Sequence, residues 1–163
     1  MPIITIAGTP IDFPNTGASP VWSDAVIEFA QLVEEALSGL VGTGDISKQA
    51  FTLDSSMNPA TNITLTGLSF STAVVRAAFI KYSVYRSTSA PSPATAYEAG
   101  EMVIVYNPAN PTNQKWELQR EYVGDGKITF TIDDSGQFSF STTAITGTAH
   151  TGKISFLATA LIQ

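Results

Sequence analysis

The sequence predicts a mainly β protein: an antiparallel β-sandwich or jelly-roll-like domain preceded by an N-terminal arm and one α-helix. Short segments in which apolar and polar residues alternate follow one another from Lys48 onward, and this alternation is typical of strands with one buried face. Gly, Pro, Asn and Asp separate the segments, as expected of turns. Before them, one longer segment has the periodicity of an amphipathic helix.

The first segment of the chain is a candidate arm. PIITIA is apolar and rich in β-branched residues, and TPIDFPNTG contains prolines that favour a fixed turn. A segment of this length cannot bury its own apolar side chains. We therefore expect Ile3, Ile4 and Ile6 to add to a neighbouring sheet and to form part of an interface.

The next segment, VWSDAVIEFAQLVEEALSGL, is the predicted helix. Ser19 is a suitable N-cap, Pro20 suits the first helical position, and Gly39 or Gly42 can end the helix. Its apolar residues occupy two heptad positions, with Trp22, Phe29 and Ala36 on one and Val26, Val33 and Leu40 on the other.

This apolar stripe has two interpretations. It can cover one face of a sheet in the same chain, or it can pack against copies of itself around a symmetry axis. We predict that residues 1–45 form an anchoring or oligomerisation segment and that residues 46–163 form the β domain.

Eight segments are candidate strands of this β domain. The clearest is KWELQREY, in which Trp116, Leu118 and Arg120 alternate with charged or amide side chains. The eight segments are KQAFTL, NITLTGLSF, VVRAAFIKYSVYR, EMVIVYN, KWELQREYV, KITFTI, QFSFST and GKISFLATAL. Two loops rich in proline and small polar residues, Ser87–Thr95 and Asn107–Asn113, interrupt the series.

Three aspartates lie at two glycine-containing corners of VGDGKITFTIDDSGQFSF, namely Asp125, Asp133 and Asp134. They could form an acidic metal site, or they could belong to two hairpin turns of a meander. Consecutive hairpin turns lie at opposite ends of a strand roughly 20 Å long, and calcium needs about 6–8 oxygen ligands. We therefore expect two structural turns and no metal site.

Few other residues suggest chemistry. His150 is the only histidine, and a general base needs an orienting partner and a reacting neighbour. We expect His150 to be a loop residue bonded to the backbone or at a subunit contact, and Glu98 and Glu101 to be solvated. No catalytic residue, enzyme activity or cofactor is predicted. The tyrosines could form a sugar-stacking platform or fill the core.

Composition and charge exclude several classes of function. The eight Lys and Arg residues are scattered and the net charge is −6, so we expect no nucleic-acid binding. No apolar run approaches the ~18 residues of a membrane helix, and the N-terminus does not resemble a signal peptide. There is no cysteine, which excludes disulfides and thiolate metal sites. Charged residues are only 13%, which suits either extensive protein contacts or a compact domain rich in Ser and Thr.

An ordered series of motifs carries a resemblance to a known class of proteins. The series is VVRAAFIKYSVYR, then Glu98-x-Gly100 before VIVYN, then KWELQREYVGD, then FTIDDSGQFSFS and HTGKISFLATAL. In this order, from about Val74 to Leu161, the chain resembles small structural proteins of tailed-bacteriophage virions. The resemblance implies a β-rich homotrimer that serves as capsid decoration (cement), head fibre or tail part, with no catalytic residues.

We therefore expect a non-enzymatic virion protein, made in the host cytoplasm, that binds itself and other virion proteins such as the major capsid or tail proteins. An alternative is a tail-associated receptor- or glycan-binding module, with a host-surface glycan held by the two proline-rich loops and nearby tyrosines. A third hypothesis, a hydrolase, would need His150 or a carboxylate pair.

Overall fold

The structure is a computed structural model that describes residues 3–6, 9–12, 26, 29, 33 and 44–162. The chain divides into two compact units, Met1–Gly42 and Thr43–Gln163.

The first unit contains a strand pair. Strand β1 (Ile3–Ile6) pairs antiparallel with β2 (Thr9–Asp12) of the same chain. The sequence predicted a turn where β2 lies, because of its proline. Pro10 is opposite Thr5 in the ladder, and a two-stranded sheet tolerates proline because each of its strands has an edge that needs no hydrogen bond.

The predicted helix is described at three positions. Val26, Phe29 and Val33 have helical backbone. Its other predicted interface residues, Trp22, Ala36 and Leu40, and its two ends lie outside the described residues. The extent of the helix therefore stays a prediction.

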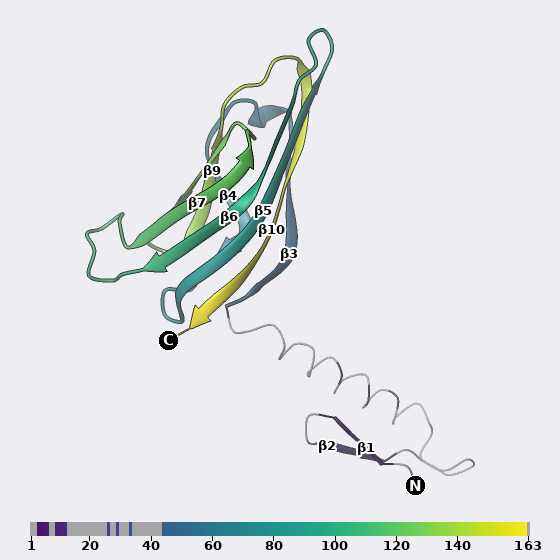
Figure 1. Ribbon diagram of the computed structural model, residues 1–163, viewed down its shortest axis with the longest axis vertical. Helices are drawn as coiled ribbons and strands as arrows, with labels where there is room; N and C mark the ends of the chain where they lie inside the picture. The colour runs from purple at the N-terminus through teal and green to yellow at the C-terminus, as the bar shows by residue number, and fades with distance from the viewer. Residues whose placement is uncertain are drawn as a thin grey trace. The chain divides into compact units, whose positions relative to one another are not determined.

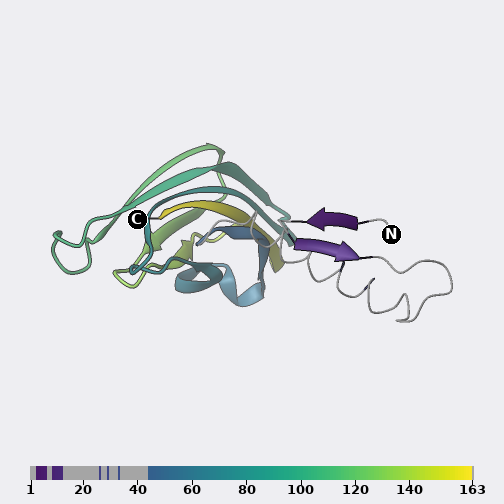
Figure 2. The ribbon, with the colours of Figure 1, turned by 90° about the horizontal axis from the view of Figure 1, so that it is seen from below.

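The second unit is built from two antiparallel sheets in two layers (Figures 1 and 2). The larger sheet has the order β3 (Ile46–Leu53), β10 (Thr148–Ile162), β5 (Val75–Ser89), β6 (Thr95–Tyr106) and β7 (Trp116–Gly124). The smaller sheet has the order β4 (Ala60–Ser69), β9 (Gln137–Thr142) and β8 (Ile128–Ile132). A short 3-10 helix, Ser55–Met57, joins β3 to β4.

All eight predicted strands are present, so the prediction of a mainly β, antiparallel and sandwich-like domain is confirmed. The jelly-roll-like part of that prediction stays a prediction. Strand β10 lies in the interior of the larger sheet, with β3 on one side and β5 on the other.

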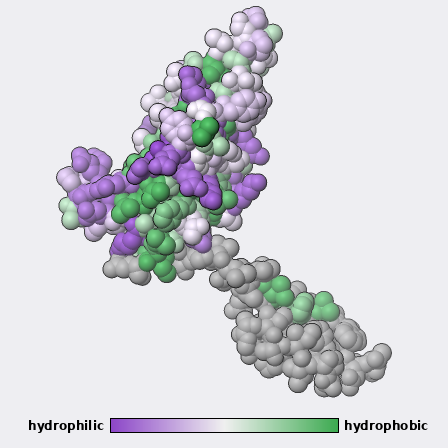
Figure 3. Space-filling model, viewed as in Figure 1, coloured by the Kyte–Doolittle hydropathy of each residue, from purple (hydrophilic) through white to green (hydrophobic). Residues whose placement is uncertain are grey.

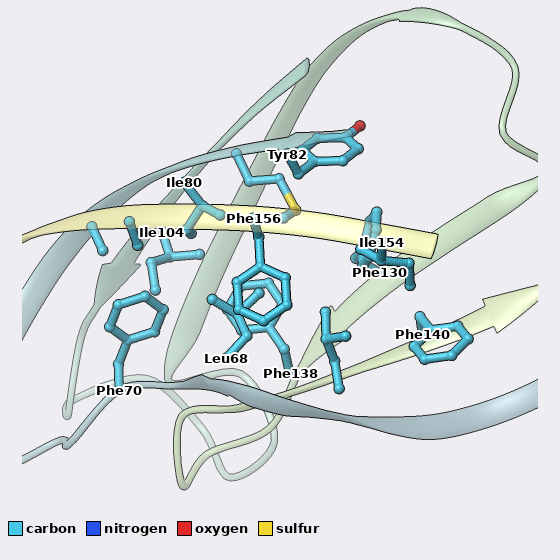
Figure 4. Close-up of a cluster of buried hydrophobic side chains, with 14 of the residues drawn as sticks. Leu68, Phe70, Ile80, Tyr82, Ile104, Phe130, Phe138, Phe140, Ile154 and Phe156 are labelled. Carbon is cyan, nitrogen blue, oxygen red and sulfur yellow. The ribbon is translucent and has the colours of Figure 1, made fainter. Parts of the chain in front are cut away.

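The hydrophobic core lies between the two sheets (Figure 4). Ile80, Ile104 and Phe156 from the larger sheet face Phe138 and Phe140 from the smaller one. Aromatic rings meet across the layers: the Tyr82 and Phe130 centroids are 5.1 Å apart and those of Phe51 and Phe140 are 5.5 Å apart. Burial of one such side chain stabilises the fold by about 1.5–3 kcal/mol.

The β5–β6 connection is shorter than the predicted Ser87–Thr95 loop. Ser87 and Thr95 are directly paired in the sheet, which leaves Ala90–Ala94 as the tip. Thr88 closes the hairpin, since its N–H donates to the Ala94 carbonyl at 3.0 Å and its hydroxyl accepts from the Ala94 N–H at 2.9 Å. Ser and Thr therefore extend the strands here, although their composition suggested a loop.

The two acidic corners differ from each other. Asp133–Gly136 is a hairpin turn between β8 and β9, as predicted, and the Gly136 N–H donates to the Asp133 carbonyl at 2.9 Å. The Gly124–Gly126 corner is not a hairpin, which corrects the prediction. It carries the chain from β7 in the larger sheet to β8 in the smaller one. A Cβ on Gly124 would lie 2.3 Å from the Tyr97 carbonyl oxygen, so only glycine fits there.

Candidate functional site

The predicted interface residues of the first unit are only partly described. Ile3, Ile4 and Ile6 lie in β1. Of the three described helical residues, Val26 is exposed and Phe29 and Val33 are half-buried. Whether these residues contact other copies stays a prediction.

Arg86 is the centre of a buried polar network. Its side chain is 0% exposed. One terminal nitrogen donates to the carbonyls of Gly126, Lys127 and Thr143 at 2.9–3.2 Å, and the other donates to Asn58 Oδ1 at 2.9 Å. Burial lowers the pKa of the guanidinium from its ordinary value, but arginine stays charged in proteins. Carbonyl and amide dipoles from the segments that flank the strands of the smaller sheet thus solvate this cation.

His150 belongs to the same network. Its Nε2 accepts from Arg86 Nε at 3.1 Å, and its Nδ1 lies 2.7 Å from the Asp54 carbonyl oxygen. This pairing requires the tautomer with hydrogen on Nδ1. The ring is buried in β10 rather than in a loop, which corrects that part of the prediction, whereas its bond to the backbone was predicted. Both ring nitrogens are used structurally.

Glu98 is the centre of a second buried network, although the sequence suggested a solvated side chain. It is 4% exposed. Its carboxylate accepts from the Tyr82 hydroxyl at 2.7 Å and from the Gly126 N–H at 3.1 Å, and it pairs with Arg120 at 3.3 Å. Burial and the bond to Glu98 raise the pKa of Tyr82. These partners are 16 or more residues away in sequence, so local pattern could not reveal them.

The aspartates at the corners hold backbone. The Asp133 carboxylate accepts from the N–H groups of Ser135 and Gln137 at 2.9 and 3.0 Å. That of Asp134 accepts from the N–H groups of Asn113 and Lys115, and so ties the β8–β9 turn to the Asn107–Lys115 loop. Asp125 pairs with Lys127.

The described residues contain no group of three or more His, Cys, Asp or Glu side chains that could hold a metal ion. In the part of the chain that the structure describes, no helix is both long and apolar enough to span a membrane.

The outer face of the larger sheet, away from the core, is unusually apolar at one end. Phe79, Val105 and Leu161 are about half exposed there. Cross-strand pairing places Phe79 beside Val103, and Ala77 between Val105 and Leu161. Figure 3 shows a green area over the region where β5 begins and β10 ends. These five residues form the apolar end of the outer face.

Further along the same strands, three rows of side chains cross the outer face. A row of mostly short side chains, Ser155, Ser83, Ala99 and Val123, has a charged row on one side and a tyrosine row on the other. The charged row contains Leu157, Lys81, Glu101 and Glu121, and the tyrosine row contains Lys153, Tyr85 and Tyr97. The short row is therefore the floor between two taller walls.

Two adjoining depressions follow this floor, with volumes of about 570 and 170 Å³. Ser83 and Ser155 line both of them, and Lys48 extends the lining to β3. We call the two depressions together the outer trough. The sequence offered a signal for it that the prediction missed: Tyr82 and Tyr85 are three residues apart on one strand and must point to opposite faces.

Comparisons with known proteins give little guidance. No family model matches the sequence, and no curated protein matches it. A search of solved structures finds a match to the Acinetobacter phage vB_ApiP_P1 tailspike protein, with a TM-score of 0.39 and 12% sequence identity. The match covers 70% of this chain and 22% of that chain. This TM-score is below the level that defines a common fold, so the function of this chain has to be argued from its own residues.

Proposed function

We propose that this chain is a non-enzymatic structural protein of a tailed-phage virion, a homotrimeric capsid decoration (cement) or head-fibre protein made in the host cytoplasm. Its arm and helix, residues 3–40, join the copies and anchor them to other virion proteins such as the major capsid protein. The β domain forms the outer body. The ordered motif series from Val74 to Leu161 supports the virion assignment.

The use of the polar side chains in the β domain supports a non-enzymatic role. Arg86, His150 and Glu98 are buried ionisable side chains, and their polar atoms are bonded to neighbouring groups of the domain. A catalytic group must instead have an atom available to a substrate.

The single observation that carries the proposal is the apolar end of the outer face. Phe79, Val105 and Leu161 leave large apolar surface in water on one continuous face. Isolated exposed apolar residues are ordinary, but a contiguous patch on a soluble protein marks an interaction surface. Adhesion to another protein is the function that such a face supports.

Mass measurement in solution tests the oligomer. We expect a particle of three times the 17.3 kDa chain mass. Phe29→Asp, on the predicted apolar stripe, should give monomers with a folded β domain, since it places a charge in the helix contact. Gln31→Asp adds the same charge on the predicted polar side and should leave the trimer intact. A monomeric parent protein, or a trimer that tolerates Phe29→Asp, would contradict the proposal.

Removal of the arm tests the anchoring. A chain without residues 1–17 should keep the thermal unfolding transition of its β domain and should no longer bind virus particles that lack their own copies. Undiminished binding would contradict the anchoring role of the arm.

The alternative role, a tail-associated receptor- or glycan-binding module, gains a specific observation from the outer trough. The site does not coincide with the two proline-rich loops named from the sequence. It lies on the outer face of the larger sheet.

A further inference from the structure

We infer that the outer trough is a binding site for an acidic oligosaccharide. The inference stands on the geometry of the larger sheet alone and does not depend on how copies of the chain assemble. Three features carry it: an exposed tyrosine pair, a hydroxyl-bearing floor, and a concentration of lysines.

The tyrosine pair supplies the stacking surface. Tyr85 and Tyr97 are direct cross-strand partners with ring centroids 5.2 Å apart and planes inclined by 43°. Cross-strand aromatic contacts stabilise a sheet by themselves, but these rings remain 42% and 58% exposed. Val123, at the end of the trough floor, is 82% exposed. Exposed aromatic faces with polar rims suit the apolar face of a sugar ring.

The floor lets a ligand approach the sheet. Ser83, Ser155 and Ala99 have short side chains, and the serines present hydroxyl groups that both donate and accept hydrogen bonds. The larger depression, about 570 Å³, falls within the range of ~300–1,000 Å³ that small-molecule sites occupy.

The length of the trough indicates a chain of sugars rather than one ring. All five strands contribute to its lining, from Lys48 in β3 to Val123 in β7. Five strands at their ordinary spacing span about 19 Å. A short oligosaccharide that crosses the strands would occupy this length.

Charge selects an acidic ligand. Lys48, Lys81 and Lys153 line the trough, which is three of the eight basic residues in a protein of net charge −6. Among the described residues, no carboxylate pairs with Lys48 or Lys153. Lys81 pairs with Glu101 at 3.6 Å on the exposed surface, a contact that is weak in water.

The carboxylates around the trough do not cancel its preference for an acidic ligand. Glu98 lines the larger depression, but its oxygens are buried and engaged by Tyr82, Arg120 and Gly126. Glu101 and Glu121 lie in the wall beyond Lys81. The two lysines without carboxylate partners are therefore available to sugar carboxylates.

Titration calorimetry on the full chain tests the inference. The probes are tetragalacturonate, an α2-8-linked sialic acid tetramer, and the methyl esters of both, which keep the sugar rings and remove the charge. We expect at least one acidic tetramer to bind at or below millimolar concentration. Its methyl ester should bind at least about fivefold more weakly, because exposed ion pairs contribute modestly.

Matched variants locate the site. Tyr97→Ala should weaken binding about tenfold, since a stacked ring is lost, whereas Phe79→Ala removes an exposed ring outside the trough and should not change it. Lys153→Gln should weaken binding about threefold or more, and Lys115→Gln should not. The four variants should still unfold cooperatively, and Tyr97→Ala should lower the unfolding midpoint by no more than a few degrees, because a cross-strand aromatic pair contributes modestly to stability.

Three results of the sugar titrations would overturn the inference. These are no binding by either acidic tetramer at millimolar concentration, equal binding of an ester and its acid, and binding that Tyr97→Ala leaves unchanged. Tighter binding of tetraglutamate than of the sugars would also overturn it, by assigning the trough to an acidic protein segment. The solution mass of Tyr97→Ala should equal that of the parent protein, and a lower mass would assign the trough to a contact between copies.

Discussion

The two faces of the five-stranded sheet use the same strands for opposite purposes. On the inner face, most side chains enter the core or one of the two buried networks, with Arg86 and Glu98 fully engaged. On the outer face, the intervening side chains include Phe79, Tyr97 and Val123, which remain in water. Because successive side chains of a strand point to opposite faces of the sheet, one set of residues can stabilise the fold while the other set forms a binding surface.

The largest expected contrast concerns phenylalanines. Phe138→Ala, at a fully buried core position, should lower the free energy of unfolding by about 3–5 kcal/mol because it leaves a cavity. Phe79→Ala, on the outer face, should change it by less than about 0.5 kcal/mol. Urea denaturation of both variants measures the difference. Equal losses would contradict the division between the two faces.

A second contrast concerns cations on β5. Arg86→Met should destabilise the domain by about 2–4 kcal/mol, because it leaves three carbonyls, Asn58 and His150 without their buried donor. Lys81→Met is the matched control, because Lys81 lies on the same strand and its side chain is on the exposed face. This substitution should leave the free energy of unfolding nearly unchanged. A stability of Arg86→Met equal to that of the control would show that the network adds nothing to the fold.

A third contrast compares two glutamates of β6. Glu98→Gln should cost about 1–3 kcal/mol, because an amide N–H₂ then faces one of the donors that the carboxylate now accepts from. Glu101→Gln removes only an exposed ion pair and should cost less than about 1 kcal/mol. Thermal and urea unfolding both report this difference, and an inverted order would contradict the burial of Glu98.

The smallest expected effect is a pH dependence at the β8–β9 turn. Partial burial raises the pKa of Asp133, but hydrogen bonds from Ser135, Gln137 and Gly136 outweigh it, so the pKa lies below its ordinary 3.8. A lowered pKa means that the stabilisation is present above about pH 4 and is lost as the pH falls through the folded-state value. For this exposed group we expect less than about 1 kcal/mol.

Asp133→Asn tests this pH dependence. The variant should lose stability at pH 7 and should show a flatter decline than the parent protein between about pH 5 and pH 2. Ser69→Ala serves as an exposed control elsewhere in the smaller sheet. Parallel declines in the parent protein and in Asp133→Asn would contradict the role of this carboxylate.

The strands were predictable from the sequence because their signal is local. Ile128, Phe130, Phe138 and Phe140 alternate with polar residues, and the structure buries all four in the core. The Asp133–Gly136 turn was predictable for the same reason, since Asp and Gly carry turn chemistry wherever they stand.

The features that the sequence did not predict depend on residues that are far apart in the chain. The Gly124–Gly126 corner has the same local chemistry as a hairpin, but the sheet that β8 joins is decided by packing against β9 and β4. Glu98 was placed in solvent because its partners Arg120 and Gly126 are remote in sequence. The outer trough was missed because it exists only once four cross-strand registers are fixed.

The interior position of β10 has a consequence for biosynthesis. Strand β5 can pair with β6 soon after both emerge from the ribosome, but its other edge and the inner edge of β3 must wait for Thr148–Ile162. Until then, two unpaired edges remain open to foreign strands, and contacts this far apart in sequence form slowly. We expect the nascent chain to be most prone to aggregation during this delay, and to benefit most from a chaperone then.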